Sequence, residues 1–194
     1  MTRLWDKGTN LDARVLRYTA GEDHLLDARL VAYDVIASTA HVNMLRAQDL
    51  LSEQDHDAIV DGLSALGAEH AEGQWQIALE DEDAHTALES RLTDRIGAAG
   101  GRMHLGRSRN DQVLAALRLC LRDAVASLSE QTHDIVRALF ALAGREAETA
   151  LPGYTHMQQA MPSTVPLWCG GFASNLQDDA DALQRCLARI NVSP

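Results

Sequence analysis

The feature that most constrains this chain is a long stretch without proline, residues 110–148, in which apolar side chains recur with helical spacing. The steps between them are three, four or seven residues, at Leu114, Leu117, Leu121, Ala124, Leu128, Ile135 and Leu142. A single helix of this length extends on the order of 55 Å, because each residue adds about 1.5 Å. Such a helix cannot bury its apolar stripe alone, and the stretch therefore predicts a long helical bundle.

A second long helix is expected near the end of the chain, from about Pro166 to Arg189. Pro152, Pro162 and Pro166 interrupt the periodic pattern before it. Two helices cannot cover each other's apolar stripes completely, since a bundle needs three or four members. We therefore expect the bundle to be incomplete within these 194 residues, with other subunits or further sequence supplying the rest.

The first half of the chain also has helical patterns, in shorter segments. Residues 1–26, punctuated by Gly8 and Gly21, are expected to be irregular. Three helices are expected after them. The first covers 27–48, the second begins at a capped start, Ser52–Asp55, and the third covers about 83–97 and stops before the Gly100-Gly101 pair. Aromatic residues make up only 4% of the chain, which favours helix over sheet. The predicted fold class is all-α, with an N-terminal helical domain over 1–109 and the first long helices of a central bundle over 110–194.

The composition narrows the classes of partner. Lys and Arg number 17 and Asp and Glu 28, and the formal net charge of −11 argues against a nucleic-acid or anionic-membrane surface. The three cysteines, an odd number without close spacing, indicate reduced thiols rather than a disulfide framework. The N-terminus lacks an apolar signal core, and no run reaches about 18 apolar residues. We therefore expect a soluble cytoplasmic protein without a membrane segment.

The densest group of polar side chains leads into the long helix and reads His104-Leu105-Gly106-Arg107-Ser108-Arg109-Asn110-Asp111-Gln112. Backbone N–H groups and the dipole at a helix N-terminus favour anions, and arginine pairs with carboxylates through two hydrogen bonds. The group therefore predicts a site for a dicarboxylate or a phosphate. The alternative is capping, in which Ser108, Asn110 or Asp111 only starts the helix.

A second polar group lies in the break between the two long helices and reads Pro152-Gly153-Tyr154-Thr155-His156-Met157-Gln158-Gln159-Ala160-Met161-Pro162. His156 can exchange a proton near neutral pH while Thr155 and Gln158 hold substrate oxygens. An ordinary loop histidine is the alternative, although the glycine and the two prolines favour a defined polar loop.

A third group is Glu82-Asp83-Ala84-His85, with Glu89 four residues beyond His85. On a helix His85 and Glu89 face the same side and can hydrogen-bond. The alternative is an ordinary helix start, because acidic residues are favoured in the first turn of a helix.

The spacing Glu-x-x-His also occurs in di-iron helical bundles, and this chain has it at Glu53/His56, Glu82/His85 and Glu130/His133. A di-iron site needs its ligands to point into the core of the bundle. Measured from Leu128, Glu130 and His133 lie about 200° and 140° round the helix, which directs them away from the apolar stripe. We therefore expect no metal site.

These groups resemble conserved blocks of the argininosuccinate lyases, members of the fumarase/aspartase superfamily. Gly106–Gln112, which reads Gly-Arg-Ser-Arg-Asn-Asp-Gln, is similar to their hallmark, and fumarases, aspartases and adenylosuccinate lyases are not expected to carry it. Further similar segments, in the family's order, are Leu4-Trp5, Asp34-Val35, Glu82-Asp83-x-His85-x-x-x-Glu89, Pro152–Gln158 with Met161-Pro162, and Asn191-x-Ser193-Pro194.

The resemblance implies a mostly helical homotetramer, with a central bundle built from all four subunits and active sites that each take segments from three chains. It implies cleavage of argininosuccinate to arginine and fumarate, without a metal or organic cofactor. A base removes the proton beside a carboxylate, hydrogen bonds stabilise the resulting aci-carboxylate, and the guanidinium nitrogen leaves. The residues implied are Ser108, Arg109 and Asn110 for substrate binding, Thr155 and Gln158 for its carboxylates, His156 with Thr155 for catalysis, and His85 lining or supporting the site.

Two departures from the family pattern matter. Leu105 stands where the family usually has Thr or Ser, and the loop Gly-Ser-Ser-x-Met-Pro-x-Lys-x-Asn, which carries the family's catalytic serine, does not occur in the 194 residues. We therefore expect the chain to correspond to the N-terminal two-fifths of such an enzyme and to be inactive alone. Two other functions stay open: an adenylosuccinate lyase-like enzyme of the same superfamily, and a non-catalytic helical scaffold or assembly protein.

Overall fold

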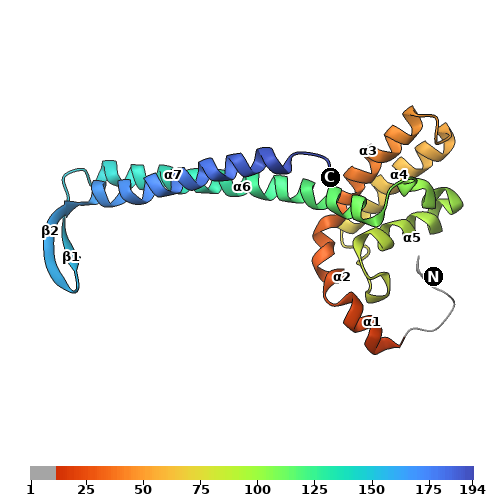
Figure 1. Ribbon diagram of the computed structural model, residues 1–194, viewed down its shortest axis with the longest axis horizontal. Coiled ribbons are helices and arrows are strands. Elements are labelled where there is room, and N and C mark those ends of the chain that lie inside the picture. Colours follow the sequence, from red (N-terminus) through yellow and green to blue (C-terminus); the bar gives the residue numbers. More distant parts are fainter. Residues whose placement is uncertain (1–11) are drawn as a thin grey trace. The chain divides into compact units, whose positions relative to one another are not determined.

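The computed structural model describes residues 12–194, so the Leu4-Trp5 segment lies outside the described residues. The chain divides into two compact units. The first comprises the described residues up to Cys120 together with Ser193–Pro194, and the second comprises Leu121–Val192. Helices form most of both units, which confirms the all-α fold class (Figure 1).

The segment expected to be irregular is helical from Ala13, so that expectation is wrong for the described residues. Helix α1 (Ala13–Ala20) begins where the carboxylate of Asp12 accepts the backbone N–H of Arg14 at 2.8 Å, and it ends at Gly21, whose φ is +51°. Helix α2 (Asp23–Leu26) and the 3₁₀ turn η1 (Asp27–Leu30) follow. Helices of one or two turns show too few positions for a periodic pattern to be recognised.

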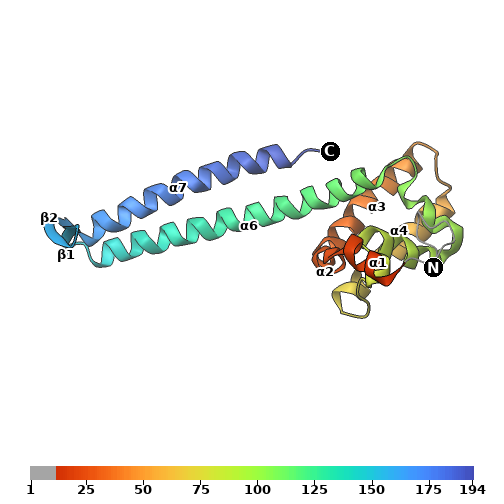
Figure 2. The same ribbon diagram turned by 60° about the horizontal axis from the view of Figure 1, so that its bottom comes forward.

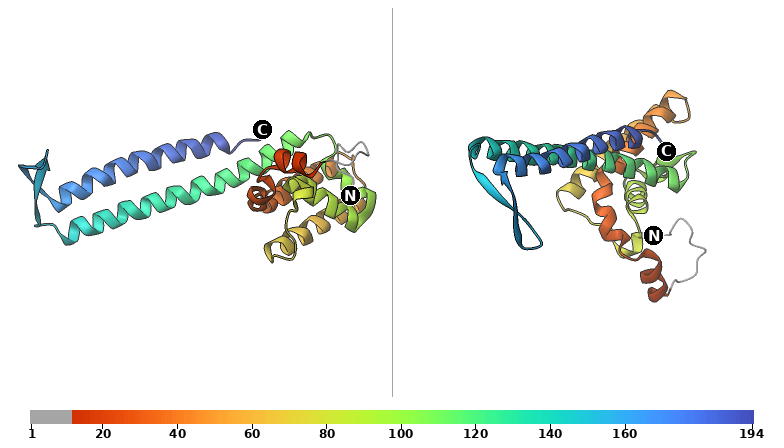
Figure 3. Two further views of the ribbon diagram at one scale, coloured as in Figure 1. Left: turned by 90° about the horizontal axis from the view of Figure 1, so that it is seen from below. Right: turned by 60° about the vertical axis from the view of Figure 1, so that its left-hand side comes forward.

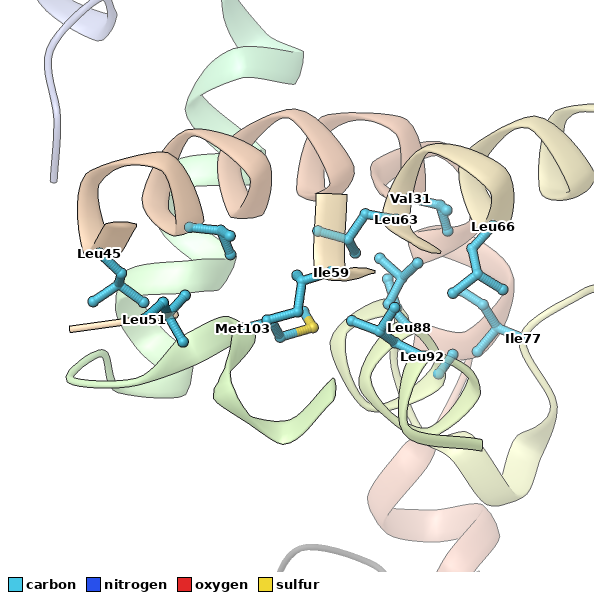
Figure 4. Packing of buried hydrophobic residues seen from close by; sticks show 13 residues of the cluster. Val31, Leu45, Leu51, Ile59, Leu63, Leu66, Ile77, Leu88, Leu92 and Met103 are labelled. Carbon is cyan, nitrogen blue, oxygen red and sulfur yellow. The ribbon is translucent and has the colours of Figure 1, made fainter. Parts of the chain in front are cut away.

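Three helices enclose the hydrophobic core of the first unit: α3 (Val31–Ala47), α4 (Glu53–Ala71) and α5 (Ala84–Ile96). The Ser52 hydroxyl accepts the Asp55 N–H at 3.1 Å, which confirms the capped start of α4. Figure 4 shows the buried side chains that fill the space between these helices, among them Val31, Leu45, Leu51, Ile59, Leu63, Leu66, Ile77, Leu88, Leu92 and Met103. A short 3₁₀ turn, η2 (Leu79–Asp81), precedes α5.

Helix α5 ends at Gly97, whose φ of +75° favours glycine, and the chain continues as the 3₁₀ segment η3 (Gly97–His104). Within η3, Gly100 lies so close to α5 that an added Cβ would be 2.7 Å from the backbone of Thr93. The glycine cluster therefore ends the helix as expected and lets η3 pack tightly against α5.

The two long helices are α6 (Arg109–Arg145) and α7 (Val165–Ile190), which confirms both expected long helices within a few residues. Helix α7 runs back alongside α6 (Figures 1–3). In the second unit, the buried side chains of this pair are small or medium-sized: Ser129, Thr132 and Val136 of α6, and Cys169, Ala173 and Ala180 of α7. Gln184 also donates from Nε2 to the Ser129 hydroxyl at 2.9 Å.

The large apolar side chains of α6 are not covered by α7. Leu128 and Ile135 are each 51% exposed, and the other exposed members of the predicted stripe are Leu114, Leu117 and Leu121. The stripe predicted from the sequence is therefore present and open in this chain.

The break between the long helices is a β-hairpin rather than the expected loop. Strand β1 (Ala150–Thr155) pairs with the antiparallel strand β2 (Gln158–Thr164), and an irregularity in register falls between Pro152 and Tyr154. The three cysteines are free thiols, as expected. None of the helices within residues 12–194 is long and apolar enough to span a membrane.

Candidate active site

The block Gly106–Gln112, called the signature block below, forms the start of α6. The Ser108 N–H donates to Asp111 Oδ2 at 2.8 Å, and the Asp111 N–H approaches Ser108 Oγ at 3.4 Å. This reciprocal pair satisfies N–H groups of the first turn, so Ser108 and Asp111 cap the start of α6. Gly106 has φ +78°, which lets the chain turn sharply into the helix.

Both arginines of the signature block contact the protein itself. Arg107 Nη2 donates to the Ser38 hydroxyl and to the Met103 carbonyl, each at 3.2 Å, and burial lowers the pKa of this guanidinium. Arg109 Nη2 lies 3.0 Å from Asp83 Oδ2 and also donates to the Thr86 hydroxyl, at the start of α5. These contacts tie the block to α3, η3 and α5.

Ser108 and Asn110 have exposed side chains at the same helix start. Helix α6 begins at Arg109 and continues to Arg145, and the positive end of its dipole lies at this start. A hydroxyl, an amide and a positive helix end suit a ligand with carboxylate groups.

A buried polar network lies beneath the block and centres on Asp34, which is 0% exposed. His85 Nδ1 lies 2.5 Å from Asp34 Oδ2, and Gln112 Nε2 donates to the two carboxylate oxygens at 3.1 and 3.2 Å. The Ser38 hydroxyl donates to Oδ1 at 2.9 Å. The network therefore joins α3, α5 and α6 through one carboxylate.

The expected hydrogen bond between His85 and Glu89 is not formed, because His85 turns to Asp34. Glu89 instead lies 3.2 Å from His104 Nδ1, and burial raises the pKa of the Glu89 carboxyl, an effect that His104 and Arg109 oppose. His41 Nε2 is 2.9 Å from the Leu105 carbonyl oxygen, and burial lowers the pKa of His41. Helical spacing alone did not reveal these partners, since they come from other elements.

The second polar group forms the tip of the hairpin. His156 and Met157 have φ of +48° and +63°, and they connect Thr155 and Gln158, which pair across the strands. Two consecutive residues with positive φ are typical of a type I′ hairpin turn, which asparagine and glycine usually form. The side chains of Thr155, His156 and Gln158 are exposed. An added Cβ at Gly153 would lie 2.6 Å from the Met161 carbonyl oxygen, which explains the glycine there.

Comparison with known proteins identifies the family. Residues 11–194 match the family described as Lyase. The chain belongs to this lyase family. An argininosuccinate lyase of Sorangium cellulosum is 48% identical to this chain over 192 residues. These residues are 99% of this chain and 45% of the Sorangium cellulosum protein. The chain thus spans less than half the length of this curated relative.

Solved structures show the same fold. The crystal structure of EDDS lyase in complex with formate superposes on this chain with a TM-score of 0.77 and 28% sequence identity. The superposition covers 96% of this chain and 37% of the EDDS lyase chain. A class II fumarase from Schistosoma mansoni has a TM-score of 0.69 at 21% identity, over 92% of this chain and 41% of that one. The resemblance to the fumarase/aspartase superfamily, first noted in the signature block, is confirmed.

The lyase chain thus holds its predicted site residues in two places. His85, Ser108, Arg109 and Asn110 belong to the first unit, at the start of α5 and α6, and Thr155, His156 and Gln158 belong to the hairpin of the second unit. Sequence reasoning did not single out Asp34 or Gln112 as site residues. The sequence does contain a signal for Asp34. This acidic residue lies on the buried face of α3, which also carries Val31, Ser38, Val42 and Leu45, and a charged residue is seldom buried without a partner.

The residues weighed as di-iron ligands have other partners or are exposed. Glu130 is exposed, and His133 Nδ1 contacts the Ser129 carbonyl at 2.8 Å. His56 lies between Asp57 and Asn43, at 2.7 and 2.8 Å. Among residues 12–194, no three His, Cys, Asp or Glu side chains are grouped so that they could hold a metal ion.

Proposed function

We propose that the chain is part of an argininosuccinate lyase, which cleaves argininosuccinate to arginine and fumarate in arginine biosynthesis. The observation that carries the proposal is the signature block, whose arginines are tied to the protein while Ser108 and Asn110 are exposed at the positive end of α6. The 48% identity to the Sorangium cellulosum argininosuccinate lyase supports the choice of substrate.

In the proposed reaction a base takes the proton from the carbon beside a carboxylate, and the electron pair of the broken carbon–hydrogen bond forms the double bond of fumarate. The carbon–nitrogen bond breaks, its electron pair stays on the guanidinium nitrogen, and that nitrogen takes up a proton. Thr155 and Gln158 would hold the carboxylates, and His156 would transfer a proton. Ser108, Asn110 and the end of α6 would stabilise the negative charge that builds up in the transition state.

The proposed assembly is a cytoplasmic homotetramer in which three subunits contribute to each site. Thr155, His156 and Gln158 are exposed in the single chain, whereas a proton-transfer site functions best where water is excluded. Segments of other subunits that covered these three residues would exclude water from them, which supports the shared site. We place the boundary between the N-terminal helical domain and the bundle at 109/110, directly after the first residue of α6.

The test uses two proteins. One is the 194-residue chain, and the other, the Sorangium chimera, carries this chain in place of the 192 matching residues of the Sorangium cellulosum enzyme. We expect the chain alone to show no turnover, because it lacks the serine loop, and the chimera to release fumarate from argininosuccinate. Release of fumarate from adenylosuccinate alone would favour the sister enzyme, and a folded chimera that is inactive with both would refute the proposal.

Replacing Asn110 by Ala in the Sorangium chimera should weaken substrate binding. A hydrogen bond to a charged group contributes about 1.5–3 kcal/mol, so we expect the dissociation constant of fumarate to rise about 10-fold or more. Asn175→Ala, at an exposed position of α7, is the matched control and should leave it unchanged. Titration calorimetry measures both, and equal affinities in the two variants would remove Asn110 from the site.

A further inference from the structure

The carboxylate of Asp34 is the most deeply buried charged group near the signature block, and the structure shows how it is compensated. Three donors surround it: Nδ1 of His85, Nε2 of Gln112 and the hydroxyl of Ser38. Asp34 and Ser38 are 0% exposed, and His85 and Gln112 are 3% and 4% exposed. A buried ionised carboxylate is tolerated only when its oxygens accept such hydrogen bonds.

The direction of each hydrogen bond follows from the chemistry of the groups. Arg107 Nη2 can only donate, so Ser38 Oγ accepts from it and directs its own hydrogen to Asp34. An ionised carboxylate only accepts, so Gln112 presents its NH₂ group and His85 carries a hydrogen on Nδ1. In the neutral imidazole, Nε2 is therefore the ring nitrogen that carries no hydrogen.

His85 Nε2 is buried and has no hydrogen-bond partner in the structure. Buried polar atoms without a partner are rare, because each one loses the hydrogen bonds that water would provide. The orphan nitrogen belongs to a side chain held firmly on its other side, which is the arrangement of a group kept ready for a ligand.

We propose that Asp34 is a positioning residue for the lyase reaction: its carboxylate fixes His85 as the Nδ1–H tautomer with Nε2 left for a ligand, and it holds the first turn of α6 through Gln112. The inference rests on the proposed function. One carboxylate thus sets the relative positions of α5 and of the helix start that carries Ser108 and Asn110. Neither effect requires Asp34 to touch the substrate.

The first measurement is the tautomer of His85 in the 194-residue chain, by nitrogen-15 NMR of labelled histidine. His85→Gln assigns the His85 signals among those of the eight histidines. In the neutral imidazole we expect Nδ1 protonated and Nε2 bare. Asp34→Asn should change the ratio of the two His85 tautomers, because the amide of the new asparagine can donate a hydrogen bond to Nδ1. Asp81→Asn, which alters a second buried carboxylate that pairs with Arg91 at 3.0 Å, should leave the ratio unchanged.

The second measurement is kinetic, in the Sorangium chimera. Misplacement of reacting groups by about 1 Å can lower the rate about 10²-fold, so Asp34→Asn should reduce kcat by about that factor with a smaller change in KM. Asp81→Asn should lower the melting temperature without such a loss of kcat. The tautomer result stands independently of lyase activity, so the two proposals fail separately.

Three results would overturn the proposal. One is a bare Nδ1 in the unmodified chain, a measurement that needs no variant to fold. Another is an unchanged His85 tautomer in folded Asp34→Asn. The third is an active chimera in which Asp34→Asn and Asp81→Asn have the same kcat.

Discussion

Replacing His156 by Asn in the Sorangium chimera should lower kcat about 10²–10⁴-fold and change KM little. This is the usual effect of removing an acid–base group, because proton transfer stabilises the transition state and not the bound substrate. Steady-state kinetics with argininosuccinate measures both constants.

Asparagine is the right replacement because of the hairpin turn. His156 has φ +48°, where asparagine is one of the few residues other than glycine that fit readily, whereas alanine would strain the backbone. Met157→Gly, at the next position with φ +63°, is the matched control, since it relaxes the turn without touching the histidine. We expect this control to keep most of the activity, and a rate for His156→Asn equal to that of the control would remove His156 from the mechanism.

The sequence predicted the long elements of the fold and not the short ones. The stripe of α6 repeats over about eight turns, from Leu114 to Leu142, so its spacing alone identifies a helix. Helices α1 and α2 have only eight and four residues, which leaves little periodic signal, and the caps Asp12 and Gly21 belong to α1 alone. The hairpin was taken for a loop because His156 and Met157 occupy positions where Asn-Gly is the recognisable signal.

The sequence predicted those features of the candidate site that depend on residues close together in the chain, and not the contacts between distant segments. The signature block indicated a helix start with anion-binding groups, and Ser108 and Asn110 do lie at such a start. That Arg109 pairs with Asp83, or that His85 turns to Asp34, depends on how distant segments pack. Pairings over 26 and 51 residues leave no periodic trace in a single sequence.

The open stripe on α6 should make the 194-residue chain self-associate at micromolar concentration. Leu121, Leu128 and Ile135 are 41%, 51% and 51% exposed, and complete burial of one such side chain stabilises by about 1.5–3 kcal/mol. Several of them along one helix form an apolar surface larger than a soluble monomer usually exposes. Sedimentation velocity should therefore show oligomers, and a single monomeric species would contradict the prediction.

Substitution on the two faces of α6 separates the stripe from general charge effects. Leu121→Glu with Leu128→Glu adds two negative charges to the stripe and should shift the chain towards monomer. Arg137→Glu makes the same change in net charge, but Arg137 is exposed and lies about 200° round the helix from Ile135, so association should persist. The two leucines are largely exposed within the chain, and their replacement should lower its melting temperature only slightly. If both variants associated equally, the stripe would not be the contact surface, and the oligomers would have to form through another part of the molecule.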